Sequence, residues 1–267
     1  MLSYPQIDPV AFALGPLTVH WYGLMYLVGF IAAWLLALRR SERPWSPVRR
    51  TQVEDLVVYG AFGVILGGRF GYVMFYNLDK WLSDPLWLFR VWEGGMSFHG
   101  GLLGVLIALW LFSRRINQSF LALGDFVTIM VPIGLGLGRI GNFIGQELWG
   151  RYTSSWLGMV FPNDPLQLPR HPSQLYQAFL EGLVLFLVLL FFTRKPRPVG
   201  MVSGLFLVLY GSFRFAVEFF REPDGHIGFD LFDWVTRGQL LSLPMIAVGV
   251  GLMLWSWLRS GRIDTVR

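Results

Sequence analysis

Three arginines, Arg69, Arg139 and Arg214, lie inside long apolar stretches of the chain. A cation in hydrocarbon is energetically costly, so an ionisable residue inside a membrane segment is by default a candidate functional residue. A guanidinium always carries its charge and offers paired N–H donors, which suits a phosphate. In a membrane the most available phosphate belongs to a phospholipid headgroup. The three arginines therefore predict a site for an anionic phospholipid or another phosphate-bearing molecule.

The stretch richest in such groups is GLGLGRIGNFIGQELWGR, residues 134–151. Arg139 and Asn142 are three residues apart, so they share one face of a helix. The surrounding glycines let another backbone or a lipid come close, and Glu147 follows within the same stretch. The alternative interpretation is a packing helix whose arginine extends to the membrane surface.

A second polar stripe is predicted near the C-terminal end of another apolar stretch. Tyr210, Arg214, Glu218 and Arg221 are spaced by four, four and three residues, which places them on one helical face. Arg214 and Glu218 can pair at i,i+4, and pairing lowers the cost of burying either group. The alternative is a structural ion pair that ties two helices. Further arginines at the same predicted depth favour a functional site.

His99, in the segment Ser-Phe-His-Gly-Gly, is the one histidine predicted inside a span. Its ordinary pKa near 6.5 suits proton transfer, although a lone histidine is usually structural. No HExxH, Walker or His-rich spacing occurs, so no metal or cofactor is predicted. The chain has no cysteine, which excludes disulfides, thiolate metal sites and a cysteine nucleophile.

Composition predicts an all-α polytopic membrane protein. The chain has 267 residues, of which 54% are hydrophobic and 15% charged, and its mean hydropathy is +0.51. Apolar windows of the length of a transmembrane helix predict seven spans. They cover residues 20–38, 56–76, 97–112, 120–138, 174–192, 201–220 and 239–258.

The distribution of basic residues predicts the orientation. Most arginines and lysines fall in the connections after the first, third, fifth and seventh spans, so the N-terminus is expected outside and the C-terminus in the cytoplasm. This asymmetry explains the net charge of +5 without a nucleic-acid partner. We expect one transmembrane catalytic domain, 1–267, with outer segments at about 77–96, 145–173 and 221–238.

Depth estimates place the polar groups together. With a rise of about 1.5 Å per residue, Tyr26, Arg69, His99, Arg139 and Arg214 all fall in the outer half of the membrane. Two classes of function fit: an enzyme that uses an anionic phospholipid, or a carrier or flippase for a phosphate-bearing lipid or solute. A carrier favours a midplane site and an internal repeat. The sequence has neither, which favours the enzyme.

Four stretches resemble the bacterial prolipoprotein diacylglyceryl transferases, in order and spacing across nearly the whole chain. They are MSFHGGL at 96–102, GRIGNF followed by ELWGR at 138–151, RHPSQLY at 170–176, and YGSFR followed by EFFR at 210–221. The resemblance implies a seven-span inner-membrane enzyme that acts at its periplasmic face. Its donor would be phosphatidylglycerol, and its acceptor the lipobox cysteine of a preprolipoprotein. The thiol would form a thioether and release glycerol phosphate.

The resemblance also implies roles for residues. Arg139 and Arg214 would stabilise the leaving phosphate, and we take His99 as the candidate base. The other expected substrate-binding residues are Tyr26, Arg69, Asn142, Glu147, Tyr210, Glu218 and Arg221. Two positions depart from the family pattern, which usually has asparagine where this chain has Gly145 and glutamate where it has Gln177.

Overall fold

The computed structural model describes residues 1–15, 17–223 and 235–264, and most of them are helical. They form two compact units, which are described separately. The first unit comprises Met1–Leu36 and Val127–Arg267, and the second comprises Ala37–Phe126. Most of the expected outer segment 221–238 lies outside the described residues.

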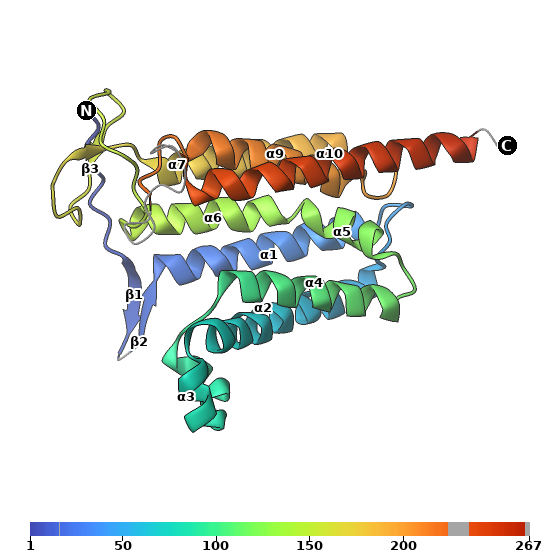
Figure 1. The fold of residues 1–267 in the computed structure, drawn as a ribbon, viewed down its shortest axis with the longest axis horizontal. Coiled ribbons are helices and arrows are strands. Elements are labelled where there is room, and N and C mark those ends of the chain that lie inside the picture. The colour runs from blue at the N-terminus through green and yellow to red at the C-terminus, as the bar shows by residue number, and fades with distance from the viewer. Residues whose placement is uncertain (16, 224–234, 265–267) are drawn as a thin grey trace. The chain divides into compact units, whose positions relative to one another are not determined.

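The first unit is built on long apolar helices, of which α9 and α10 run side by side (Figure 1), while α6 packs against η4. Within the span Ser173–Phe192, α7, η4 and α8 follow one another without a break, and η4 has π-helical geometry. The helices are α1 (Trp21–Ser41, which continues into the second unit), α6 (Val131–Ile144), α7 (Ser173–Gln177), η4 (Ala178–Val184), α8 (Leu185–Phe192), α9 (Met201–Val217) and α10 (Arg237–Asp264).

Two apolar clusters hold the first unit together. One contains Ile129, Leu185 and Val202, which joins the start of α6 to α8 and α9. The other surrounds Tyr4, whose hydroxyl donates to the backbone carbonyls of Phe143 and Ile144 at 3.0 and 3.1 Å. These carbonyls belong to the last turn of α6, where no intrahelical donor remains. Tyr4 therefore fixes the end of the helix that carries Arg139.

The second unit is organised around two packed helices, α2 and α4. Glycines of α2 and α4 face one another where the two helices cross. A Cβ atom at Gly63 would lie 2.8 Å from the carbonyl oxygen of Gly104, and one at Gly71 would lie 2.7 Å from the Cα of Gly100. The helices of this unit are η1 (Arg50–Gln52), α2 (Val53–Tyr76), α3 (Leu78–Ser83), η2 (Pro85–Phe89), η3 (Val91–Glu93), α4 (Phe98–Arg115) and most of α5 (Phe120–Thr128).

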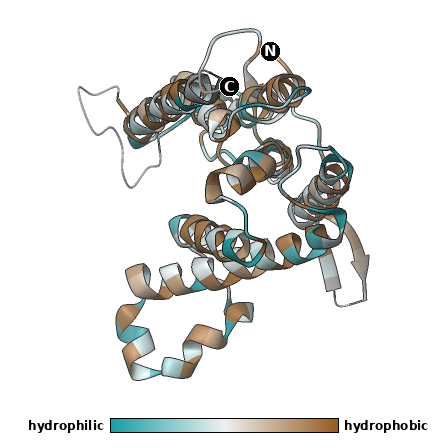
Figure 2. Cartoon of the chain, turned by 90° about the vertical axis from the view of Figure 1, so that its right-hand side faces the viewer, coloured by the Kyte–Doolittle hydropathy of each residue, from teal (hydrophilic) through white to brown (hydrophobic). Residues whose placement is uncertain are grey.

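The membrane character of the chain is confirmed in outline. Within the described residues, four helices are long and apolar enough to cross a membrane, or five if the broken pair of α5 and α6 is one span. Large apolar side chains such as Leu27, Ile31 and Leu35 of α1 are exposed, as expected for helices that face lipid. Figure 2 shows brown apolar residues on the helices, with teal hydrophilic residues mainly at helix ends and in connections.

Two expectations about secondary structure need correction. The chain is not purely helical, because two short antiparallel pairs occur: β1 (Val10–Leu14) with β2 (Leu17–His20), and β3 (Met159–Val160) with β4 (Pro169–Arg170). They form where the backbone lies outside the long helices and must pair with itself. The fourth predicted span, 120–138, ends too early, because α6 continues to Ile144. Its glycines stay helical where they pack against neighbouring helices.

Candidate active site

Helix α6 presents Arg139 and Asn142 on one face, as their spacing predicts. Asn142 is buried, and its Oδ1 accepts a long hydrogen bond of 3.5 Å from Nη1 of Arg139. Among the described residues this is the only hydrogen bond of the Arg139 guanidinium. Most of its five N–H donors therefore have no hydrogen-bond partner in the described part of the chain.

Two tyrosines of α1 pack on the glycine face of α6 beside Arg139. The hydroxyl oxygens of Tyr22 and Tyr26 lie 3.1 Å apart. A Cβ atom at Gly138 would lie 3.8 Å from the Tyr26 hydroxyl oxygen, and one at Gly141 would lie 2.9 Å from the Tyr22 ring. A side chain at 141 would displace Tyr22, so glycine is required there for α1 to approach. The predicted site residue Tyr26 is thus adjacent to the Arg139 turn.

The predicted stripe at the end of α9 forms an ion-pair network. Nη2 of Arg214 lies 3.0 Å from one carboxylate oxygen of Glu218, and Nη1 of Arg221 lies 3.3 Å from the other. The regular helix ends at Val217, but the Glu218 N–H still donates to the Arg214 carbonyl at 3.1 Å. The turn therefore keeps all three charged groups on one side.

The start of α10 covers the Glu218 carboxylate. Thr236 and Gln239 form a reciprocal cap, in which each backbone N–H donates to the other side chain, at 3.0 and 3.4 Å. A Cβ atom at Gly238 would lie 2.7 Å from the Glu218 carboxyl carbon, so a side chain at position 238 would collide with this carboxylate. Helix N-termini favour negative charge. Glu218 is thus held between two arginines and a helix start.

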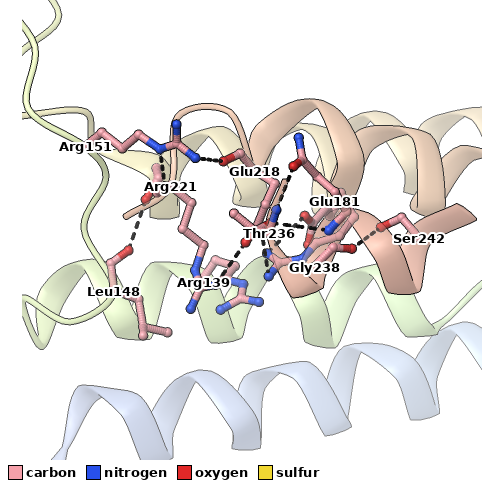
Figure 3. Close-up of polar contacts among 12 residues, drawn as sticks. Arg139, Leu148, Arg151, Glu181, Glu218, Arg221, Thr236, Gly238 and Ser242 are labelled. Atoms are coloured by element: carbon pink, nitrogen blue, oxygen red, sulfur yellow. Dashed lines mark hydrogen bonds and ion pairs between the residues drawn. The ribbon is translucent and has the colours of Figure 1, made fainter. Parts of the chain in front are cut away.

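Arg151 connects the loop after α6 to the same network. Its Nε donates to the carbonyl of Arg221 at 2.9 Å, and its Nη2 donates to the carbonyl of Glu218 at 3.3 Å. Figure 3 shows Arg151 at the upper left, bonded to Glu218 and Arg221, while the Arg221 side chain extends down toward Arg139. Arg151 is absent from the predicted site because its place in a loop gives no sign of this backbone contact.

Glu147 and Tyr210 lie beside these groups. The backbone of Glu147 is held at both ends, because its N–H donates to Asn142 at 2.9 Å and its carbonyl accepts from the Gln174 amide at 2.6 Å. Its exposed carboxylate interacts electrostatically with Tyr22. Tyr210 stacks on Phe206 with ring centroids 5.5 Å apart and interacts with the charges of the network.

One residue of the network is absent from the predicted site. Glu181 of η4 is fully buried, and its Oε1 lies 4.0 Å from Nη1 of Arg214. It is the one acidic residue in the apolar segment AFLEGLVLF. A carboxylate within such a segment is itself a signal of function. The site predicted from the sequence was built around the arginines and did not include Glu181.

Arg69 belongs to the second unit, where its guanidinium is committed to the backbone. Its Nε, Nη1 and Nη2 donate to the carbonyls of Leu88, Gly94 and Trp87 at 3.0, 2.5 and 2.7 Å. The side chain is 2% exposed and its guanidinium carbon lies 4.5 Å from the centroid of a Trp87 ring. Four of its five N–H donors therefore have carbonyl partners, the fourth being Gly95 at 3.5 Å, and little donor capacity remains for a phosphate.

His99 also belongs to the second unit. It lies in the first turn of α4, which begins at the N-cap residue Ser97, whose hydroxyl accepts from the Gly100 N–H at 3.3 Å. The imidazole is exposed and contacts the Phe98 ring edge-on. The remaining predicted site residues all belong to the first unit. A joint role for His99 and the arginines remains a prediction.

The loop that supplies Arg151 also carries His171. Nδ1 of His171 lies 3.1 Å from the Tyr176 hydroxyl, and burial lowers the pKa of this imidazole below its ordinary value. Burial thus favours the neutral form of this imidazole. No group of three or more His, Asp or Glu in the described ranges could hold a metal ion.

Comparisons with known proteins show the family of the chain. Residues 9–255 match the family model described as prolipoprotein diacylglyceryl transferase. A phosphatidylglycerol–prolipoprotein diacylglyceryl transferase of Teredinibacter turnerae is 62% identical, over 96% of this chain and 93% of the relative. The enzyme of that name from Azotobacter vinelandii is 58% identical, over 98% of this chain and 99% of the relative. With its apolar helices the chain is a multi-pass membrane protein, and it belongs to the prolipoprotein diacylglyceryl transferase family.

Proposed function

We propose that this protein transfers the diacylglyceryl group of phosphatidylglycerol to the lipobox cysteine of a preprolipoprotein, the first step of lipoprotein maturation. The cysteine sulfur bonds to the glycerol carbon, the bond from that carbon to the phosphate oxygen breaks, and glycerol phosphate leaves. Family membership supports the reaction. The observation that carries it is the cluster of Arg139 and Arg214, whose guanidinium groups retain donors for a phosphate.

The reaction requires two things of these residues: removal of the thiol proton and stabilisation of the leaving phosphate. Thiolate is the nucleophile, so the cysteine must lose its proton, and we assign His99 as the base. The departing phosphate gains negative charge, which Arg139 and Arg214 stabilise. Asn142 and Glu218 orient these two arginines.

The other site residues serve the headgroup and the walls of the site. Arg221 adds positive charge beside Glu218. Tyr26 and Tyr210 contact the bound lipid beside the arginines in this proposal, and Glu147 orients the headgroup. Arg69 is a further phosphate contact in this proposal, although it ranks below the others because its donors already have carbonyl partners.

The same proposal includes the finer topology. The chain forms one catalytic domain, 1–267, with seven spans in the bacterial inner membrane and its site toward the periplasm. The excess of arginine in alternate connections supports this orientation. A reporter fused after Arg267 should read cytoplasmic, and one inserted near Asp84 should read periplasmic. The reverse pattern would overturn the placement of the site.

The function is tested directly with purified protein, phosphatidylglycerol and a lipobox peptide. Mass spectrometry should detect the thioether product, and a peptide with serine in place of cysteine should yield none. Phosphatidylethanolamine and phosphatidylcholine should be used poorly, because a cationic site favours a donor with net negative charge. Absence of product would refute the transferase. Equal turnover of zwitterionic donors would refute the anionic-site argument.

A further inference from the structure

Glu181 lies where the charged network crosses from one helix to another. It is the fourth residue of η4, whose π-helical turns interrupt the span between α7 and α8. Turns of this kind are rare, occur mostly as single bulges inside α-helices, and are frequent at functional sites. The wider turn rotates the following residues relative to a regular α-helix. Glu181 is buried within this irregular segment.

Close packing brings η4 against α6. A Cβ atom at Gly182 would lie 2.6 Å from the Cα of Gly136, and a Cβ atom at Gly136 would lie 3.0 Å from the Cα of Gly182. Glu181 immediately precedes Gly182, and Arg139 follows Gly136 by three residues, less than one turn. Because both contact points are glycines, the two backbones approach closely enough for these charges to interact.

The surroundings of the Glu181 carboxylate are unusual. The side chain is fully buried, yet neither of its oxygens accepts a hydrogen bond from any described residue. A buried carboxylate without hydrogen bonds is costly, so an electrostatic partner must offset the cost. Nη1 of Arg214 lies 4.0 Å away and also lacks a hydrogen-bond partner among the described residues.

A second arginine approaches Glu181 from a different helix. The contact of Gly136 with Gly182 brings the α6 turn that precedes Arg139 against the η4 turn that carries Glu181. Glu218 is already committed, because its two oxygens face Arg214 and Arg221 at the end of α9. Glu181 is therefore the buried acidic group between the Arg139 turn of α6 and Arg214 of α9.

We infer that Glu181 is a positioning residue of the transfer reaction, and this inference rests on the proposed function. As the shared counter-ion, it holds the Arg139 and Arg214 guanidinium groups at one spacing against their mutual repulsion. The distance of 4.0 Å and the missing hydrogen bonds leave their donors available. Both arginines can then bind the same phosphate as its charge grows.

The decisive variant is Glu181→Gln, which removes the charge and keeps the shape of the side chain. Loss of a negative charge makes the site more positive, so KM for phosphatidylglycerol should stay the same or fall. The two guanidinium groups should lose their common spacing, and small displacements of catalytic groups are costly. We expect kcat to fall at least about tenfold. A purely structural defect would instead reduce the folded fraction or raise KM.

Two further variants sharpen the test. Glu181→Asp keeps the charge on a shorter side chain, so its kcat should lie between those of wild type and Glu181→Gln. The double variant Glu181→Gln with Arg214→Lys should lose much less than the product of the two single losses, because both changes disturb one contact. Gln177→Met is the matched control. It alters a buried polar residue one turn earlier in the same span, and kcat should stay within about threefold of wild type.

Each outcome decides the proposal. Wild-type kcat in folded Glu181→Gln overturns the positioning role, as does a Glu181→Asp variant no better than Glu181→Gln. If Glu181→Gln does not fold, Glu181→Asp decides alone: a lower kcat at unchanged KM supports the role, and wild-type kcat overturns it. Wild-type protein runs beside every variant. Absence of thioether from wild type would overturn the transferase proposal, and with it any role for Glu181 in the transfer.

Discussion

The first unit contains two buried sets of opposite charges, and they are built in opposite ways. In the loop after α6, Arg170 donates to both carboxylate oxygens of Asp164, at 2.6 and 3.3 Å. The same oxygens also accept from the backbone N–H groups of Leu166 and Leu168, at 3.2 and 3.3 Å. The Asp164 carboxylate therefore has four hydrogen bonds and no capacity left for a ligand.

The network between α6 and α9 is the reverse case. Neither oxygen of Glu181 and neither hydrogen of Arg214 Nη1 has a hydrogen-bond partner among the described residues. A half-satisfied buried network is worse for stability than an apolar core, so stability alone does not explain it. The contrast indicates that Asp164 and Arg170 fold the loop, whereas the second set keeps its donors for a substrate.

We call the set of Arg139, Arg214, Glu181 and Glu218 the open network, and Asp164 with Arg170 the closed pair. The strongest test of this contrast is the removal of a donor group from the open network. Arg139→Lys keeps the charge and loses the planar fork. It should fold and insert normally and lose at least about tenfold in rate, equivalent to about 1.4 kcal/mol. Arg139→Ala should lose roughly 100- to 1000-fold, the range for loss of one transition-state donor. Turnover of phosphatidylglycerol with the lipobox peptide measures both.

The loss should appear in kcat more than in KM, because the phosphate gains charge mainly in the transition state. Size-exclusion profiles and Tm in detergent serve as the folding control. Wild-type turnover from a well-folded Arg139→Lys protein would show that Arg139 is at most a bulk positive charge. The phosphate-binding role would then pass to Arg214.

A change in the closed pair, Asp164 and Arg170, should lower the stability of the fold and leave the reaction rate nearly unchanged. Asp164→Asn leaves the 8%-exposed Arg170 side chain with the half-exposed Glu222, 3.5 Å away, as its only anionic partner among the described residues. Breaking a buried pair is strongly destabilising, so we expect Tm to fall by roughly 5 °C or more. The rate per folded molecule should stay within about threefold of wild type. A large loss of kcat at unchanged Tm would place this pair in the reaction and erase the contrast.

Acid should weaken the same pair. Hydrogen bonds from Arg170 and two backbone N–H groups hold the pKa of Asp164 below its ordinary value of 3.8. A depressed carboxyl pKa stabilises the fold above the unfolded pKa, and this contribution is lost as pH falls through the folded pKa. Wild-type Tm should therefore drop as pH falls below about 4. Asp164→Asn should show a smaller drop, and identical acid profiles would contradict the assignment.

The sequence predicted the residues of the open network better than their partners. Helical spacing was sufficient for Arg139 with Asn142 and for Arg214 with Glu218, because i,i+3 and i,i+4 neighbours are fixed by local geometry. The contact of Gly238 with Glu218 and that of Glu181 with Arg214 join separate helices. Such contacts depend on how helices pack, which no periodicity encodes.

Irregular backbone was the other feature that could not be predicted from the sequence. The short strands and the π-helical η4 depend on tertiary contacts, so apolar windows described them only as loop or span. Arg69 is the converse case, because the sequence predicted a binding role for it but not its hydrogen-bond partners. Its place in an apolar stretch predicted a binding role, but an apolar stretch does not reveal that three carbonyls of a later loop would meet its guanidinium.

The smallest change in rate is expected for Arg69→Lys. All three guanidinium nitrogens of Arg69 donate to carbonyls, so Arg69 resembles Arg170 more than Arg139. Lysine cannot reproduce this fork, so Tm should fall while kcat per folded molecule stays within about threefold of wild type. The comparison requires parallel turnover and melting measurements on Arg139→Lys and Arg69→Lys. If Arg69→Lys lost tenfold in kcat at wild-type Tm, hydrogen bonds to backbone carbonyls would no longer distinguish Arg69, the weaker phosphate contact, from Arg139.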